Sequence, residues 1–259
     1  MTRMKLNYEA YGKGKPVIIL HGLFGSLDNW HSFAEHLGEY FRVFVIDQRN
    51  HGRSPHADEF SYEMTAEDLK EFMLEQNLES SSLIGHSMGG KTAMQFSFTY
   101  PEKVDNLIVV DISPKRNNAR YKEVTDAIKA LTAVDLKNIA TLREADEQMM
   151  PHVKDFAVRQ FLLKNLVRAK NGKFTWKVNL SAISKNYDKI VGGVRGRPFN
   201  RPCVFIRGEH SDYVLDKDWP EIKKYFPHAE LVTIPKAGHW VHIDAPHIFK
   251  TIVLGSLIS

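Results

Sequence analysis

The sequence predicts an α/β fold in which helices flank a mostly parallel central sheet, with a helical cap inserted into it. Two observations carry this prediction. Apolar runs of strand length alternate with segments whose apolar residues recur at helical spacing, which is the pattern of strand–helix units. In addition, the run Pro16–Leu20 is continuously apolar, as expected for a strand that is buried on both faces of a parallel sheet.

The expected elements alternate through both ends of the chain. The strands are expected at residues 6–11, 16–20, 41–46, 83–84, 107–111, 203–206 and 230–234. Helical spacing of apolar residues predicts helices at about 30–37, 64–77, 91–96, 219–226 and from Pro246.

The alternation stops between residues 118 and 189. This stretch is helix-like, with a short extended break at Phe174–Val178, and it contains no apolar run of the core-strand type. We therefore predict a helical cap at 118–189, inserted between two strands of a core made of residues 1–117 and 190–259. Phe161, Phe174 and Trp176 would belong either to the core of this cap, which we favour, or to a substrate wall.

Bulk composition is that of an ordinary globular protein. Of 259 residues, 43% are hydrophobic and 25% are charged, and the net charge of +4 is spread along the chain. The densest basic stretch, Val194–Arg201, has three arginines, too few for the footprint of a nucleic-acid-binding protein. The single cysteine, Cys203, excludes an internal disulfide and lies in an apolar run.

The sequence lacks two features that would bear on the location of the protein in the cell. Residues 1–7 lack the apolar core of a signal peptide, and no run approaches the roughly 18 apolar residues of a membrane span. We therefore predict a cytoplasmic protein without a membrane span, and leave its oligomeric state open.

The segment Ile84–Gly90 reads G-x-S-x-G around Ser87, between an apolar pair and a helix-competent run. In a nucleophile elbow, small residues two positions on either side of the serine let the neighbouring strand and helix approach closely. The serine then lies at the N-terminus of a helix, where backbone amides favour negative charge. The alternative for these residues alone is a glycine-rich turn without chemistry.

A serine hydroxyl is a weak nucleophile, so it needs a base, and the base needs a carboxylate that orients it. Candidates for these roles follow predicted strands in the order Ser87, then Asp111 or Asp212, then His239. In an open α/β sheet, the carboxyl ends of the strands form one crevice. His242 invites a metal-site interpretation, but no cysteine or carboxylate cluster accompanies it, so we predict neither a metal nor a cofactor.

Four segments, taken in the order of the chain, support a resemblance to a known superfamily. They are His21–Gly25 (HGLFG), Asp47–Ser54 (DQRNHGRS), Gly85–Gly90 (GHSMGG) and Gly238–His239. Along nearly its whole length the sequence resembles the α/β-hydrolase superfamily. The segments DQRNHGRS, VVDISP and RGEHSDYV are most similar to those of the subfamily of small bacterial esterases and abhydrolase domain-containing protein 11.

The resemblance implies a catalytic triad in which Ser87 is the nucleophile and His239 is the general base. Many relatives place the acid as Gly-x-x-Asp after the strand that here ends at Ile206, a register that falls on Ser211, next to Asp212. The subfamily instead places it 24 positions after the serine, which is Asp111. We favour Asp111 and keep Asp212 as the alternative.

An oxyanion hole would be formed by the backbone N–H groups of Met88 and Leu23, with the Phe24 amide as the weaker choice for the second donor. Phe24, His86 and Trp176 are the candidate pocket residues. Asp47 and His51 are expected to brace loops around the crevice.

The implied activity is hydrolysis of carboxylic esters, or of acyl-CoA thioesters, through an acyl-enzyme. Lys115 and Arg116 are the only candidate phosphate partners for a CoA group. The alternatives are a carbon–carbon bond hydrolase or cofactor-free haloperoxidase on the same residues, or a weakly catalytic ligand receptor of the same fold.

Overall fold

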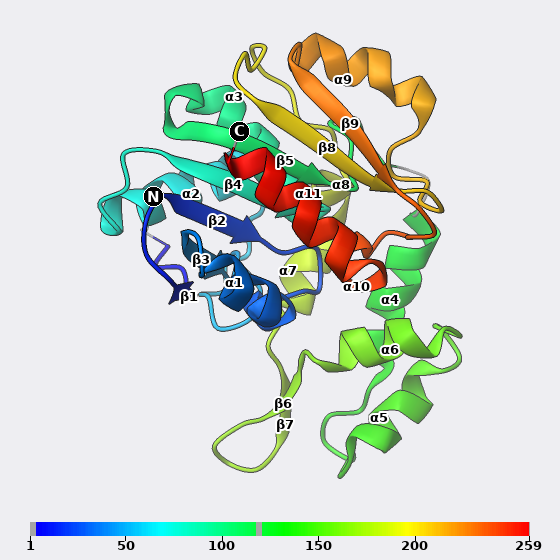
Figure 1. Cartoon of the computed structure of the whole chain (residues 1–259). Helices are drawn as coiled ribbons and strands as arrows, with labels where there is room; N and C mark the ends of the chain where they lie inside the picture. The colour runs from blue at the N-terminus through cyan, green and yellow to red at the C-terminus, as the bar shows by residue number, and fades with distance from the viewer. Residues whose placement is uncertain (1–3, 118–120, 259) are drawn as a thin grey trace.

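A seven-stranded sheet forms the centre of the computed structural model, which describes residues 4–117 and 121–258 (Figure 1). Its strand order is β1-β3-β2-β4-β5-β8-β9, and β1 pairs antiparallel with β3 while all other pairs are parallel. The strands are β1 (Tyr8–Tyr11), β2 (Pro16–Leu20), β3 (Arg42–Ile46), β4 (Ser81–His86), β5 (Val104–Val110), β8 (Cys203–Gly208) and β9 (Ala229–Ile234). The predicted fold class is therefore confirmed.

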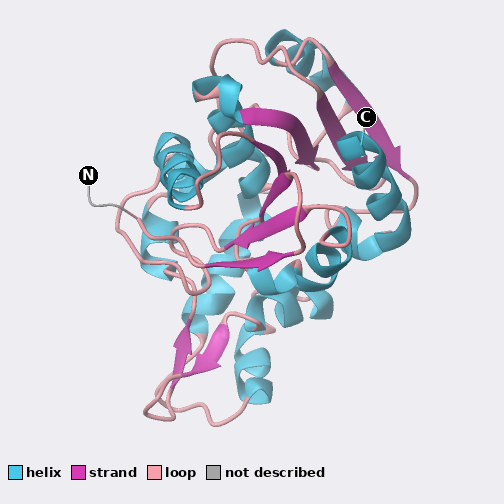
Figure 2. Cartoon of the chain, turned by 60° about the vertical axis from the view of Figure 1, so that its left-hand side comes forward, coloured by secondary structure: helices cyan, strands magenta, loops and turns pink. Residues whose placement is uncertain are grey.

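Helices cover both faces of this sheet, as Figures 1 and 2 show. They are α1 (His31–Leu37), α2 (Tyr62–Glu75), α3 (Met88–Thr99), α9 (Trp219–Tyr225), α10 (Val241–Asp244) and α11 (Pro246–Ile258), with 3-10 turns at Leu27–Asn29, Pro101–Lys103 and Asp216–Asp218. Alternate side chains of one strand point to opposite faces. Ile18 of β2 thus packs in one core with α2, α3 and α9, whereas Ile19 packs in the other with α1 and α11.

A long segment between β5 and β8 lies against one end of this core, and its α5, α6 and β6–β7 parts project away from the sheet (Figure 1). It contains α4 (Tyr121–Ala133), α5 (Leu142–Met149), α6 (Phe156–Leu163), β6 (Leu166–Arg168), β7 (Phe174–Trp176), α7 (Leu180–Lys185) and α8 (Tyr187–Val191). The expected extended break is the second strand of a β6–β7 hairpin. The expected first cap residue, Asn118, lies outside the described residues, and α8 runs across the expected end at Lys189.

Candidate active site

The turn between β4 and α3 is as tight as the glycine pattern around Ser87 requires. A Cβ atom at Gly89 would lie 2.3 Å from the carbonyl oxygen of Leu20, and one at Gly85 would lie 2.4 Å from the carbonyl oxygen of Gly89. Ser87 itself has a φ of 52° and a ψ of −115°, a strained conformation for a residue with a side chain. The chain therefore presents Ser87 on a sharp turn at the N-terminus of α3, and its side chain lines a cavity.

Asp111 and His239 come together from two different strand ends. Asp111 directly follows β5, is fully buried, and has its Oδ2 2.7 Å from Nδ1 of His239, in the loop after β9. The carboxylate also accepts hydrogen bonds from the Gly208 amide (3.2 Å) and from the hydroxyl of Ser211. Because a carboxylate only accepts hydrogen bonds, Nδ1 of His239 carries the proton, and Nε2 is left as the basic nitrogen.

Ser211 is the member of this cluster that the sequence interpretation missed as a site residue. Its hydroxyl donates to the same oxygen, Oδ2 of Asp111, that faces His239. The available signal was its position, since the Gly-x-x-Asp register of many relatives falls on it. Asp212, the alternative acid, is exposed, whereas Asp111 is in hydrogen-bond contact with His239.

Two aromatic rings hold His239 in place. Tyr213 stacks on it with 3.7 Å between ring centroids and 13° between planes. His86 donates from Nε2 to the carbonyl oxygen of His239 over 2.9 Å, so it fixes the backbone of this loop. His86 also lines the cavity.

The candidate oxyanion donors are the amides of Leu23 and Met88. The Phe24 amide donates to Nε2 of His51 over 3.3 Å, so it is already used. Met88 is the first residue of α3, and its N–H therefore has no acceptor within the helix. Among the described residues, neither Leu23 nor Met88 has a protein acceptor for its N–H.

A cavity of about 740 Å³ joins these groups. Its wall includes Ser87, His239, Phe24 and His86, together with Phe161, whose ring lies 5.2 Å from that of Trp240. Trp176 is not part of this wall, so its assignment as a pocket residue is wrong. It lies in β7, paired with Leu166, and packs against the hydrophobic core that contains Ile18.

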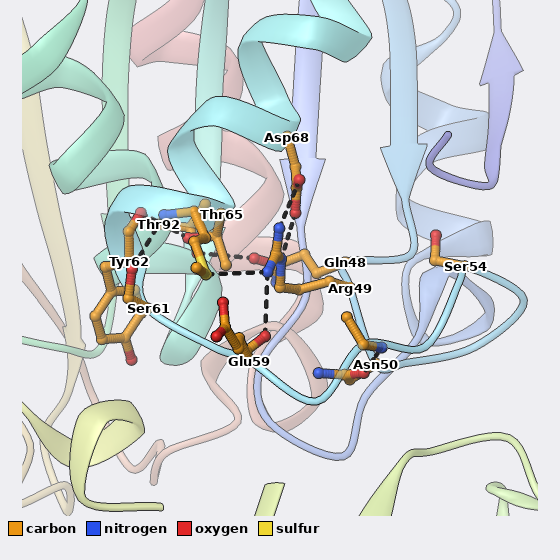
Figure 3. A network of polar contacts seen from close by, with 12 residues as sticks. Gln48, Arg49, Asn50, Ser54, Glu59, Ser61, Tyr62, Thr65, Asp68 and Thr92 are labelled. Carbon is orange, nitrogen blue, oxygen red and sulfur yellow. Dashed lines mark hydrogen bonds and ion pairs between the residues drawn. The ribbon is translucent and has the colours of Figure 1, made fainter. Parts of the chain in front are cut away.

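Gln48 anchors the loop that carries the Leu23 amide through several hydrogen bonds. Its backbone N–H donates to Nε2 of His21 (3.0 Å), and its side-chain amide donates to the carbonyl oxygen of His21 (2.6 Å). Its Oε1 accepts a hydrogen bond from Thr92 of α3 (2.8 Å), as Figure 3 shows. Gln48 thus ties the oxyanion loop to the helix that begins at the elbow.

Next to Gln48, Arg49 makes a two-pronged ion pair with Asp68 of α2, at 2.5 and 2.8 Å (Figure 3). Asp47 accepts from the backbone amides of Leu27 (2.8 Å) and Arg53 (2.9 Å), while Asn7 donates to it from its side chain (2.8 Å). Asp47 therefore braces loops around the crevice, which is the role expected for it.

Three histidines around the site are neutral: His21 and His51 are buried, and His242 is partly buried. Burial lowers the pKa of His21 to about 4 and the pKa values of His51 and His242 to about 3. The hydrogen bonds agree for His51, because Nδ1 faces the carbonyl of Arg49 and Nε2 accepts from Phe24.

These pKa values predict a loss of stability in acid. Below pH 6.5 the unfolded chain protonates the three histidines, whereas the folded protein does not until about pH 4 to 3, so folding becomes less favourable as the pH falls through this window. We expect the free energy of unfolding to fall by at least about 2 kcal/mol between pH 6.5 and 5, measured by urea titration. His51→Asn should flatten this dependence, while the exposed His228→Asn should leave it unchanged; equal slopes in both variants would contradict the assignment.

Two absences apply to the described residues. They contain no group of three or more His, Cys, Asp or Glu side chains that could hold a metal ion. No helix among residues 4–117 and 121–258 is long and apolar enough to cross a membrane.

The sequence was compared with known families and proteins. The family model described as alpha/beta hydrolase fold matches residues 15–246. The chain belongs to this family. An α/β-hydrolase from mouse, the sn-1-specific diacylglycerol lipase ABHD11, is 39% identical over 93% of this chain and 80% of its own length. Esterase YbfF of Escherichia coli (strain K12) is 34% identical over 94% of this chain and 95% of its own.

A solved α/β-hydrolase structure is also similar. The structure described as a marine microorganism esterase superimposes with a TM-score of 0.95 at 48% identity, covering 97% of this chain and 99% of that one. The similarity to esterases over nearly whole chains establishes that this α/β-hydrolase is a carboxylic-ester hydrolase with a small-molecule ester substrate, as predicted.

Proposed function

We propose that this protein cleaves carboxylic esters through an acyl-enzyme formed on Ser87. The observation that carries the proposal is the contact of Asp111 Oδ2 with His239 Nδ1, because it leaves Nε2 of His239 basic in the cavity that Ser87 also lines. His239 takes the proton of the Ser87 hydroxyl as its oxygen attacks the ester carbonyl. It then gives this proton to the leaving alcohol.

Developing charge on the substrate oxygen is stabilised by the amides of Leu23 and Met88, together with the N-terminal end of α3. Water then hydrolyses the acyl-enzyme through the same kind of proton transfer. His239 removes a proton from the water, the hydroxide attacks the acyl-enzyme, and the proton returns to Ser87 as the acid leaves.

Oxygen esters are a better match to the site than acyl-CoA thioesters. Both candidate phosphate partners have carboxylate partners of their own: Lys115 pairs with Asp218, and Arg116 pairs with Asp188 at 2.8 Å. A CoA phosphate would have to displace one of these carboxylates. The cytoplasmic location remains a prediction.

The test is covalent labelling. A fluorophosphonate probe should modify Ser87 stoichiometrically, as read by mass spectrometry of the proteolysed protein, because the probe needs both an activated serine and an oxyanion hole. Labelling should be abolished in the His239→Ala variant and preserved in His228→Ala, in which an exposed histidine is replaced. Failure to label Ser87 in the folded protein would favour the ligand-receptor alternative.

A further inference from the structure

A buried lysine that the proposed reaction does not use lies on the wall of the cavity. Lys91 is on α3, four residues after Ser87, and only 2% of it is exposed. Lysines are almost never buried to this extent unless they are paired. Among the described residues, however, no carboxylate lies within ion-pair distance of its Nζ.

The partners of Lys91 are neutral. Its Nζ donates to the carbonyl oxygen of Val191 over 3.1 Å and to that of Gly192, at the end of α8. An ammonium group has three N–H donors, so one of them remains after these two bonds. Because Lys91 also lines the cavity, we expect this remaining donor to be available to a further acceptor there.

The electrostatics of this wall favour a negatively charged acceptor. An isolated cation in a buried environment is costly, and burial together with Arg116 lowers the pKa of Lys91 to about 7. An anion beside Nζ would stabilise the ammonium form. The carboxylates on the cavity wall, Glu123 and Asp244, are exposed, so water screens their repulsion.

The position of Lys91 on α3 indicates that it faces the acyl part of the substrate. The Lys91 amide donates to the carbonyl oxygen of Ser87 over 3.1 Å, so Lys91 lies in the first turn of the helix that follows Ser87, and both residues line the cavity. The alcohol must lie beside His239, which donates its proton. Lys91 instead contacts the end of α8, next to Tyr62 at the start of α2, whose hydroxyl donates to Ile190 over 2.6 Å.

We propose that Lys91 binds a carboxylate at the far end of a short acyl group, so that the enzyme prefers half-esters of dicarboxylic acids to neutral esters of the same length. This inference rests on the ester hydrolysis proposed above. Lys91 would then determine specificity, in addition to holding the end of α8 through its two carbonyl contacts.

The experiment compares two substrates on each protein preparation. Ethyl hydrogen glutarate carries the carboxylate, and its primary-amide counterpart has the same length without the charge. The measured quantity is the ratio of kcat/KM for the acid to kcat/KM for the amide, with ethanol release as the readout. This ratio does not depend on how much of a variant is folded, because both substrates are measured on the same preparation.

The wild-type ratio should be about 10 or more, the range of a charge-assisted hydrogen bond, and Lys91→Met should bring it to about 1. The matched control is Lys164→Met, since Lys164 also lines the cavity but is exposed; its ratio should equal that of the wild type. A wild-type ratio of 1 or less, an unchanged ratio in Lys91→Met, or a collapse in Lys164→Met would overturn the proposal. Wild-type protein that hydrolyses neither these nor any other ester would instead refute the proposed function itself.

Discussion

Replacing Ser87 with alanine is expected to lower kcat for small acyl esters by about 10⁶-fold, the scale seen when a serine protease loses its nucleophile. The loss is this large because the remaining groups act on a nucleophile that no longer exists. The measurement is turnover of a chromogenic acyl ester by highly purified protein, so that contaminating esterases do not mask the loss.

The fold should survive this substitution. Alanine removes only the hydroxyl, and the approach of β4 to α3 depends on Gly85 and Gly89. Ser113→Ala is the control: this serine is buried and follows β5, and it does not line the cavity. Its turnover should remain within about twofold of the wild type. Retained turnover in Ser87→Ala, with an unchanged melting temperature, would exclude Ser87 as the nucleophile.

The sequence predicted the features that local pattern determines. The apolar runs of β2 and β5 identify buried strands because a parallel strand is covered on both faces. Asp111 could be placed at the carboxyl ends of the strands because it directly follows such a run. The glycines around Ser87 could be interpreted because the tight turn leaves no room for a Cβ atom.

Contacts between distant segments were harder to predict. Ser211 reaches Asp111 across 100 residues, and only the pairing of β5 with β8 makes them neighbours. For Trp176 the choice between cap core and substrate wall stayed open, because an aromatic residue in a short strand gives no indication of which side faces the cavity. The buried state of Lys91 was equally inaccessible, since its neighbours come from α8, a hundred residues later.

Replacing Asp111 with asparagine is expected to lower kcat by about 10⁴-fold, by analogy with the loss of the aspartate in a serine protease triad. An asparagine amide that faces Nδ1 of His239 donates a hydrogen bond instead of accepting one. His239 would then carry its proton on Nε2 and could not accept the proton of Ser87. The substrate KM should change little, because Asp111 is fully buried and is not on the cavity wall.

Asp212→Asn is the comparison that decides between the two acids, and its kcat should stay within about threefold of the wild type, as for other exposed substitutions. Both variants should fold, since an asparagine oxygen at position 111 can still accept from the amide of Gly208. A large loss in Asp212→Asn with a small one in Asp111→Asn would show that the acid is wrongly assigned. It would also require the loop after β8 to rearrange when substrate binds, because His239 Nδ1 is already 2.7 Å from Asp111 and Asp212 is exposed to solvent.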